Sequence, residues 1–68
     1  MKKYVIILNG TNFPYYLCFD PDRPRPTDWT HFTARAEKFD TYKTAQNCIE
    51  EWGIEDARIE EINLTKQI

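Results

Sequence analysis

The chain opens with two short segments whose apolar and polar positions are typical of β-strands. Residues Lys3–Leu8 form the run K-Y-V-I-I-L, which is β-branched and too short for a stable helix, so it predicts a strand. Residues Phe13–Phe19 predict a second strand. Asn9-Gly10 between them favours a type I′ turn, because both residues tolerate a positive φ; Asn9–Asn12 can instead form a four-residue loop. Either connection gives an antiparallel hairpin.

Two weaker segments follow the hairpin. Asp20–Asp28 contains three prolines, which fix φ and remove backbone donors, and this predicts an extended, solvated connection. Within Trp29–Lys38, the residues Phe32, Ala34 and Ala36 alternate with polar positions, which favours a third strand. The run A-R-A-E-K also has good helix propensity, so an early helical turn is left open.

The clearest element is a helix within Phe39–Gly53. Asp40 or Thr41 can accept a hydrogen bond from a free N–H of the first turn, and Phe39 can pack back onto that turn. Gly53 suits the left-handed residue that ends many helices. An apolar stripe recurs at helical spacing, and it consists of Ala45, Cys48, Ile49 and Trp52.

The last predicted element is a strand over Ala57–Leu64. Its apolar positions slip in phase between Ile59 and Ile62, which predicts a bulge or two short pieces. The order of elements is then β-β-(β)-α-β. It predicts a single small α+β domain over residues 1–68, with one helix packed on a mainly antiparallel sheet of three to four strands.

Charge is distributed unevenly along the chain. Residues 1–45 hold seven basic and five acidic side chains, whereas residues 46–68 hold two basic and six acidic ones. An acidic segment repels phosphate and offers a negative surface to a basic partner. We therefore predict an acidic partner-binding face made of Glu50, Glu51, Glu55, Asp56, Glu60 and Glu61.

Aromatic residues are numerous, with two Trp, four Tyr and four Phe among 68 residues. Four of them lie on faces that the helix should cover and are expected in the core: Phe13, Phe19, Phe39 and Trp52. Others lie at element ends or on the opposite sheet face. Because Tyr, Trp and Arg dominate interface hot spots, an alternative binding patch is predicted. It consists of Tyr16, Arg23, Arg25, Trp29 and Tyr42.

The sequence contains few of the residues and motifs that enzyme catalysis requires. His31 is the only histidine, there are two glycines, and no nucleophile motif or phosphate-binding loop is present. Cys18 and Cys48 lack metal-ligand spacing and are expected as small buried hydrophobes, with a disulfide only if they face each other. We expect no catalytic residue, no metal and no cofactor. No segment has the length of a membrane span or signal peptide, so a cytoplasmic protein is expected.

Three runs in the second half of the chain resemble small proteins encoded by phages and prophages: F-D-T-Y-K-T-A, I-E-E-W-G and A-R-I-E-E-I. The similarity covers roughly Ala36–Leu64. It implies a phage accessory protein, a group that includes compact anti-CRISPR inhibitors, which act by occupying a surface of a larger nucleoprotein machine. No catalytic or binding residue is carried over. The matching positions are Phe39, Asp40, Thr41, Ala45, Ile49 and Ile59.

The leading hypothesis is a protein-binding inhibitor or adaptor of phage or mobile-element origin, whose acidic face meets a basic groove on a larger host protein or nucleoprotein complex. The second is a nucleic-acid-binding module, and an enzyme ranks last. Membrane binding is not expected. Self-association is left open, because an apolar first strand at a sheet edge could pair with a second copy. The nucleic-acid hypothesis uses exposed aromatic residues around Arg23, Arg25, Arg35, Lys38 and Lys43.

Overall fold

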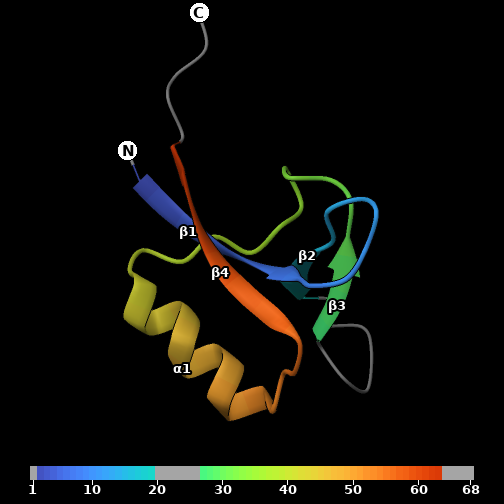
Figure 1. Ribbon diagram of the computed structural model, residues 1–68. Coiled ribbons are helices and arrows are strands. Elements are labelled where there is room, and N and C mark those ends of the chain that lie inside the picture. The colour runs from blue at the N-terminus through green and yellow to red at the C-terminus, as the bar shows by residue number, and fades with distance from the viewer. Residues whose placement is uncertain (1, 20–26, 64–68) are drawn as a thin grey trace, which may run out of the picture.

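The computed structural model describes residues 2–19 and 27–63, which form four strands and one helix (Figure 1). The strands make one antiparallel sheet in the order β3-β2-β1-β4. This confirms the predicted α+β class and order of elements. The elements are β1 (Lys2–Leu8), β2 (Tyr16–Phe19), β3 (Thr27–Thr30), α1 (Tyr42–Trp52) and β4 (Ala57–Asn63).

Strand β1 lies at the centre of the sheet. On one side it pairs with β4 along its whole length, from Lys2 opposite Asn63 to Leu8 opposite Ala57. On the other side, β2 pairs only with the carboxyl-terminal half of β1. Along the amino-terminal half of β1, Phe39 takes the place of a strand partner. It exchanges backbone hydrogen bonds with Tyr4 at N···O distances of 2.8 and 2.9 Å.

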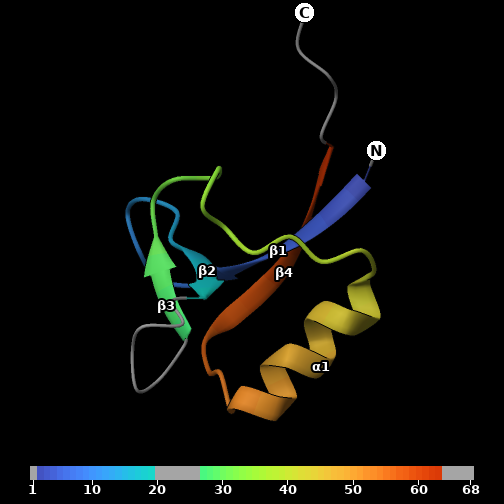
Figure 2. The same cartoon turned by 180° about the vertical axis from the view of Figure 1, so that it is seen from behind.

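Both faces of β1 are buried. Val5, Ile6 and Ile7 follow one another and are 0%, 0% and 4% exposed, although consecutive strand residues point to opposite faces. Ile6 packs on the side of Ala45 of α1, whereas Val5 and Ile7 pack with Ala36 from the segment that joins β3 to α1. That segment crosses β1 before it enters the helix (Figure 2).

Helix α1 begins and ends as its sequence predicts. Thr41 is the N-cap and accepts a hydrogen bond from the backbone N–H of Thr44, whose hydroxyl accepts in return from Thr41 N–H. These bonds satisfy amides that the first turn would otherwise leave free. Gly53 closes the helix at φ 62°, in the left-handed region that glycine enters without steric cost.

The hairpin between β1 and β2 is confirmed, but its connection is longer than predicted. Residues 9–15 form the loop, and Gly10 has φ 79° while Asn9 does not have a positive φ, so the type I′ turn is absent. Asn9 is instead bound to the start of β4. Its backbone N–H donates to the Asp56 carbonyl at 2.7 Å, and its side-chain oxygen accepts from Arg58 at 2.7 Å.

The third strand is shorter and earlier than predicted. β3 includes Thr27 and Asp28, which we assigned to the proline-rich connection, and it ends at Thr30. Residues 33–36 form a turn, in which Arg35 N–H donates to the Phe32 carbonyl at 3.0 Å. The alternation around Ala34 and Ala36 therefore marks a turn over the sheet and not a strand.

The predicted bulge in the last strand is wrong, because β4 pairs with β1 through seven consecutive residues without a break. The phase slip has another cause. Ile59 packs with the cluster under α1, whereas Ile62 packs with Val5 and Ile7 on the opposite face. The expected edge position of the first strand is also wrong, because β3 and β4 are the edges. Self-pairing through β1 is therefore excluded.

Two of the four aromatic residues expected in the core are exposed. Phe13 lies in the loop before β2 and is 68% exposed, and Phe19 is 37% exposed because the helix does not extend over the end of β2. Phe39 packs into the core as expected, and Trp52 is half-buried. Cys18 and Cys48 form no disulfide, since Cys18 alternates with Leu17 and so points away from the helix.

Replacing Ile6 should destabilise the domain far more than replacing Phe13. We expect Ile6→Ala to lower the free energy of unfolding by about 2–5 kcal/mol, close to the whole stability of so small a domain, and Ile6→Val by about 0.5–1.5 kcal/mol. Phe13→Ala should change it by no more than about 0.5 kcal/mol. Urea unfolding followed by circular dichroism measures all three. Equal losses for Ile6→Ala and Phe13→Ala would contradict the assignment of the core.

Candidate functional site

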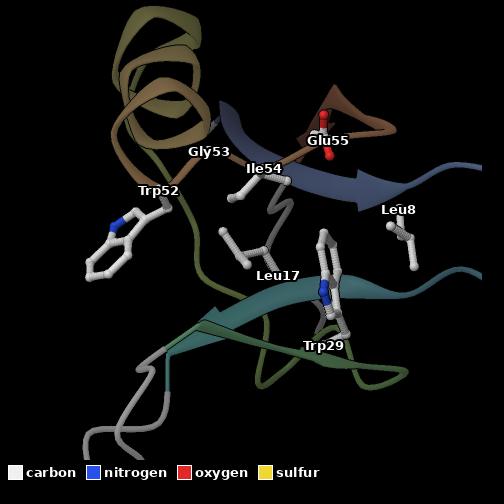
Figure 3. A pocket seen from close by; sticks show the side chains of 7 residues that line it. All are labelled: Leu8, Leu17, Trp29, Trp52, Gly53, Ile54 and Glu55. Atoms are coloured by element: carbon white, nitrogen blue, oxygen red, sulfur yellow. The ribbon is translucent and has the colours of Figure 1, made fainter.

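One helix is too narrow to cover four strands, and part of the sheet face beneath it stays open. α1 lies over β1 and β4, apart from β3, in both views of the molecule (Figures 1 and 2). A groove of about 220 Å³, lined mainly by apolar side chains, opens between the end of α1 and the strands β2 and β3 (Figure 3). We call it the tryptophan groove. It is lined by Leu8, Leu17, Trp29, Trp52, Gly53, Ile54 and Glu55.

The two tryptophans come from separate elements. Trp29 is opposite Leu17 in the pairing of β3 with β2, and Trp52 is the last residue of α1. Figure 3 shows their indoles on either side of Leu17. The ring of Phe19 lies 6.5 Å from that of Trp52, centroid to centroid, and extends the apolar surface beyond the helix end. Large, half-buried aromatic side chains of this kind are typical anchors of binding surfaces.

Carboxylates accompany the helix on the side of the groove. Burial raises the pKa of the Cys48 thiol above its ordinary value, and the negative charges of Glu51 and Glu37 raise it further. Both carboxylates therefore act on the same side of α1. Glu37 lies near β2, because its N–H donates to the Leu17 carbonyl at 2.9 Å, and Glu55 lines the groove. We call Glu37, Glu51 and Glu55 the groove-side carboxylates.

The six predicted acidic residues do not form one face. Glu50 and Glu51 are exposed on the last turn of α1, and Glu55 and Asp56 lie in the following turn, where Asp56 has φ 56°. Glu60 and Glu61 are neighbours on β4 and point to opposite faces of the sheet. Their charges are also paired, Glu60 with Arg58 at 2.7 Å and Glu61 with Lys2 at 3.7 Å.

The predicted aromatic and basic patch is not assembled either. Tyr16 packs with Val5 and Ile7 on the face away from the helix, while Trp29 lies in the tryptophan groove on the helix side. Tyr42 is 54% exposed and contacts Tyr4 edge to face, with centroids 6.2 Å apart. Arg23 and Arg25 lie outside the described residues.

The structure reveals a second exposed aromatic group that the sequence analysis missed. His31 stacks on Tyr15 with ring centroids 4.1 Å apart and meets the edge of Phe13 at 6.3 Å. Phe32, the next residue, is 64% exposed. We call these four residues the hairpin-end aromatic cluster. No strand pattern could have revealed it, because all four of its members lie in loops or turns.

The described part of the chain forms neither a metal-binding cluster nor a membrane-spanning helix. Across residues 2–19 and 27–63, no group of three His, Cys, Asp or Glu side chains could hold a metal ion. In the same part of the chain, α1 is the only helix, and it lacks the length and apolar character to cross a membrane. The tryptophan groove combines mainly apolar lining side chains with the carboxylate of Glu55, and this arrangement is suited to binding.

Comparison of the chain with protein-family models, curated proteins and solved structures finds no match in any of the three.

Neutralising Glu51 should make Cys48 more reactive. Because the Glu51 charge raises the thiol pKa, Glu51→Gln should lower it, increase the thiolate fraction at pH 8–9 and speed alkylation by iodoacetamide a few-fold at most. Mass spectrometry of tryptic peptides separates Cys48 from Cys18. Glu50→Gln is the matched control and should leave the rate unchanged. Equal rates in the wild type and both variants would show that Glu51 does not act on the groove side of the helix.

Proposed function

We propose that the chain is a non-enzymatic protein-binding module, which receives a segment of a larger protein in the tryptophan groove and blocks that protein's surface as an inhibitor or adaptor. The observation that carries the proposal is the groove itself. Leu17, Trp29 and Trp52 leave an apolar recess open to solvent in a domain with few fully buried side chains. Trp-lined recesses surrounded by polar residues are the common form of interface hot spots.

The size of the groove favours a protein segment over a small-molecule ligand. Sites for drug-sized ligands and cofactors usually enclose about 300–1,000 Å³. The groove measures about 220 Å³, enough for one large side chain and its neighbours. Within the described residues, neither indole N–H of Trp29 or Trp52 has a hydrogen-bond partner, so each can donate to a bound backbone carbonyl.

The biological setting belongs to the same proposal. Resemblance to phage and prophage proteins supports a mobile-element origin and action in the host cytoplasm. A host defence protein, including a CRISPR effector, is the proposed target. Occupying a target surface requires no catalytic group, and a compact 68-residue domain suits that task.

A second candidate function is binding of single-stranded nucleic acid, and the observation that favours it is the hairpin-end aromatic cluster. Exposed Phe13 and Phe32 offer ring faces on which bases can stack. The basic residues near it are partly engaged, because the Lys38 ammonium donates to the carbonyls of Thr33 and Ala36. Arg35 remains exposed. Phe13 and Phe32 do not line the tryptophan groove, so the two functions can be tested with different substitutions.

A substitution at Trp52 should abolish partner binding. The tagged chain is used to recover partners from a bacterial lysate with and without nuclease, and recovered proteins are quantified by mass spectrometry. We expect a nuclease-resistant partner whose recovery falls at least about thirtyfold for Trp52→Ala, the scale of a hot-spot residue. Trp52 is preferred to Trp29 because only Trp29 packs into the buried cluster.

Phe13→Ala is the matched control, since it removes an exposed aromatic ring that does not line the groove. It should leave recovery of the protein partner unchanged, and circular dichroism should show that both variants are folded. Recovery that disappears with nuclease and falls for Phe13→Ala but not for Trp52→Ala would replace the proposal with the nucleic-acid function.

A further inference from the structure

We infer that the segment bound in the tryptophan groove is basic, with a large apolar side chain as its anchor and Lys or Arg residues beside it. The inference rests on the proposed function and specifies the chemistry of its ligand. It follows from two features that meet at this place. Most side chains that line the groove are apolar, and the charged side chain in its lining, Glu55, is negative.

The groove-side carboxylates are available to a partner. Among the residues that the structure describes, Glu37, Glu51 and Glu55 form no ion pair with a cation. Glu60 and Glu61 on β4 are paired, by contrast, with Arg58 and Lys2. Among the described residues, Glu50 and Asp56 also form no ion pair, so unpaired negative charge gathers around the end of α1 and the turn that follows it, where a basic segment can neutralise it.

The end of α1 adds to the negative field. The last turn of a helix carries a partial negative charge from its free carbonyl groups, and Lys or Arg there would be stabilising. α1 has no basic residue in its last turn and has Glu50 and Glu51 instead. This arrangement opposes the stability of the isolated helix. A basic ligand at the helix end relieves the repulsion, because its charge compensates both the carboxylates and the helix dipole.

The tryptophans favour the same ligand. An indole ring attracts a guanidinium or ammonium group over its face and also packs well against aliphatic side chains. Trp29 and Trp52 lie on either side of Leu17 (Figure 3), so an apolar anchor can rest on Leu17 while a neighbouring Arg or Lys covers an indole. Phosphate would be repelled by the same carboxylates, which disfavours nucleic acid at this surface.

The test is selection of random 12-residue peptides displayed on phage against the full chain. We expect enriched peptides to combine an aromatic or large aliphatic residue with at least two Lys or Arg residues within four positions. The affinities of synthetic copies are then measured by tryptophan fluorescence at low and at physiological salt. Binding should weaken as salt increases, because the attraction is partly electrostatic.

Two triple variants with the same change of net charge separate local from global electrostatics. Glu37→Gln, Glu51→Gln and Glu55→Gln together should weaken binding of the selected peptides about tenfold. The control combines Asp40→Asn, Glu60→Gln and Glu61→Gln, which removes three charges that lie before the start of α1 and on β4. It should leave affinity within about twofold, and loss of three ion pairs at the surface should affect folding little.

The outcomes distinguish this inference from the function on which it rests. Enriched peptides that are neutral or acidic, but whose binding is lost in Trp52→Ala, would overturn the basic ligand and leave the protein-binding function in place. An equal effect of both triple variants would also overturn it, since net charge alone would then explain the result. If no enriched peptide depends on Trp52, the groove is not a peptide site and both proposals fail.

Discussion

The burial of β1 on both faces is the constraint on which the rest of the structure depends. Val5, Ile6 and Ile7 are consecutive and almost fully buried, so each face of the central strand needs a cover. Residues 2–19 and 27–63 supply one helix for this purpose, and the second cover is the irregular segment that includes Ala36. α1 packs on β1 and β4, and the helix-side face of β2 and β3 is therefore left open. The candidate site is therefore a consequence of how the core is covered.

The elements with local signals could be predicted from the sequence. The helix is specified by Thr41 at its start and Gly53 at its end. The hydrogen bonds that each of these caps makes are to residues three or four positions away in the sequence. The apolar run of β1 is similarly local. β3 was placed too late and a bulge was predicted in β4, because pairing partners and the second cover of the sheet are non-local. Ile59 and Ile62 serve opposite faces, which no single-strand pattern distinguishes from a bulge.

The candidate site was only partly predictable for the same reason. Trp29 was selected as a binding residue, but Trp52 was assigned to the core, and their placement on either side of Leu17 depends on three separate elements. Strand alternation assigns Glu60 and Glu61 to different faces once β4 is known to be unbroken. Glu37 could not be selected at all, because its position beside β2 results from a backbone hydrogen bond to Leu17. Counting acidic residues along the sequence therefore shows that the second half of the chain is negative, but it does not show which of these side chains lie near the groove.

Stability and binding make opposite demands on the end of α1. A design for stability alone would extend the apolar cover over Trp29 and place Lys or Arg in the last helical turn. This chain does neither: an apolar recess stays open, and Glu51 and Glu55 lie beside it. Each departure weakens the isolated domain slightly, and the ligand that we propose, a basic segment with an apolar anchor, would compensate both. Because one kind of ligand compensates two independent departures, the two features are better explained together than as separate accidents of a small surface.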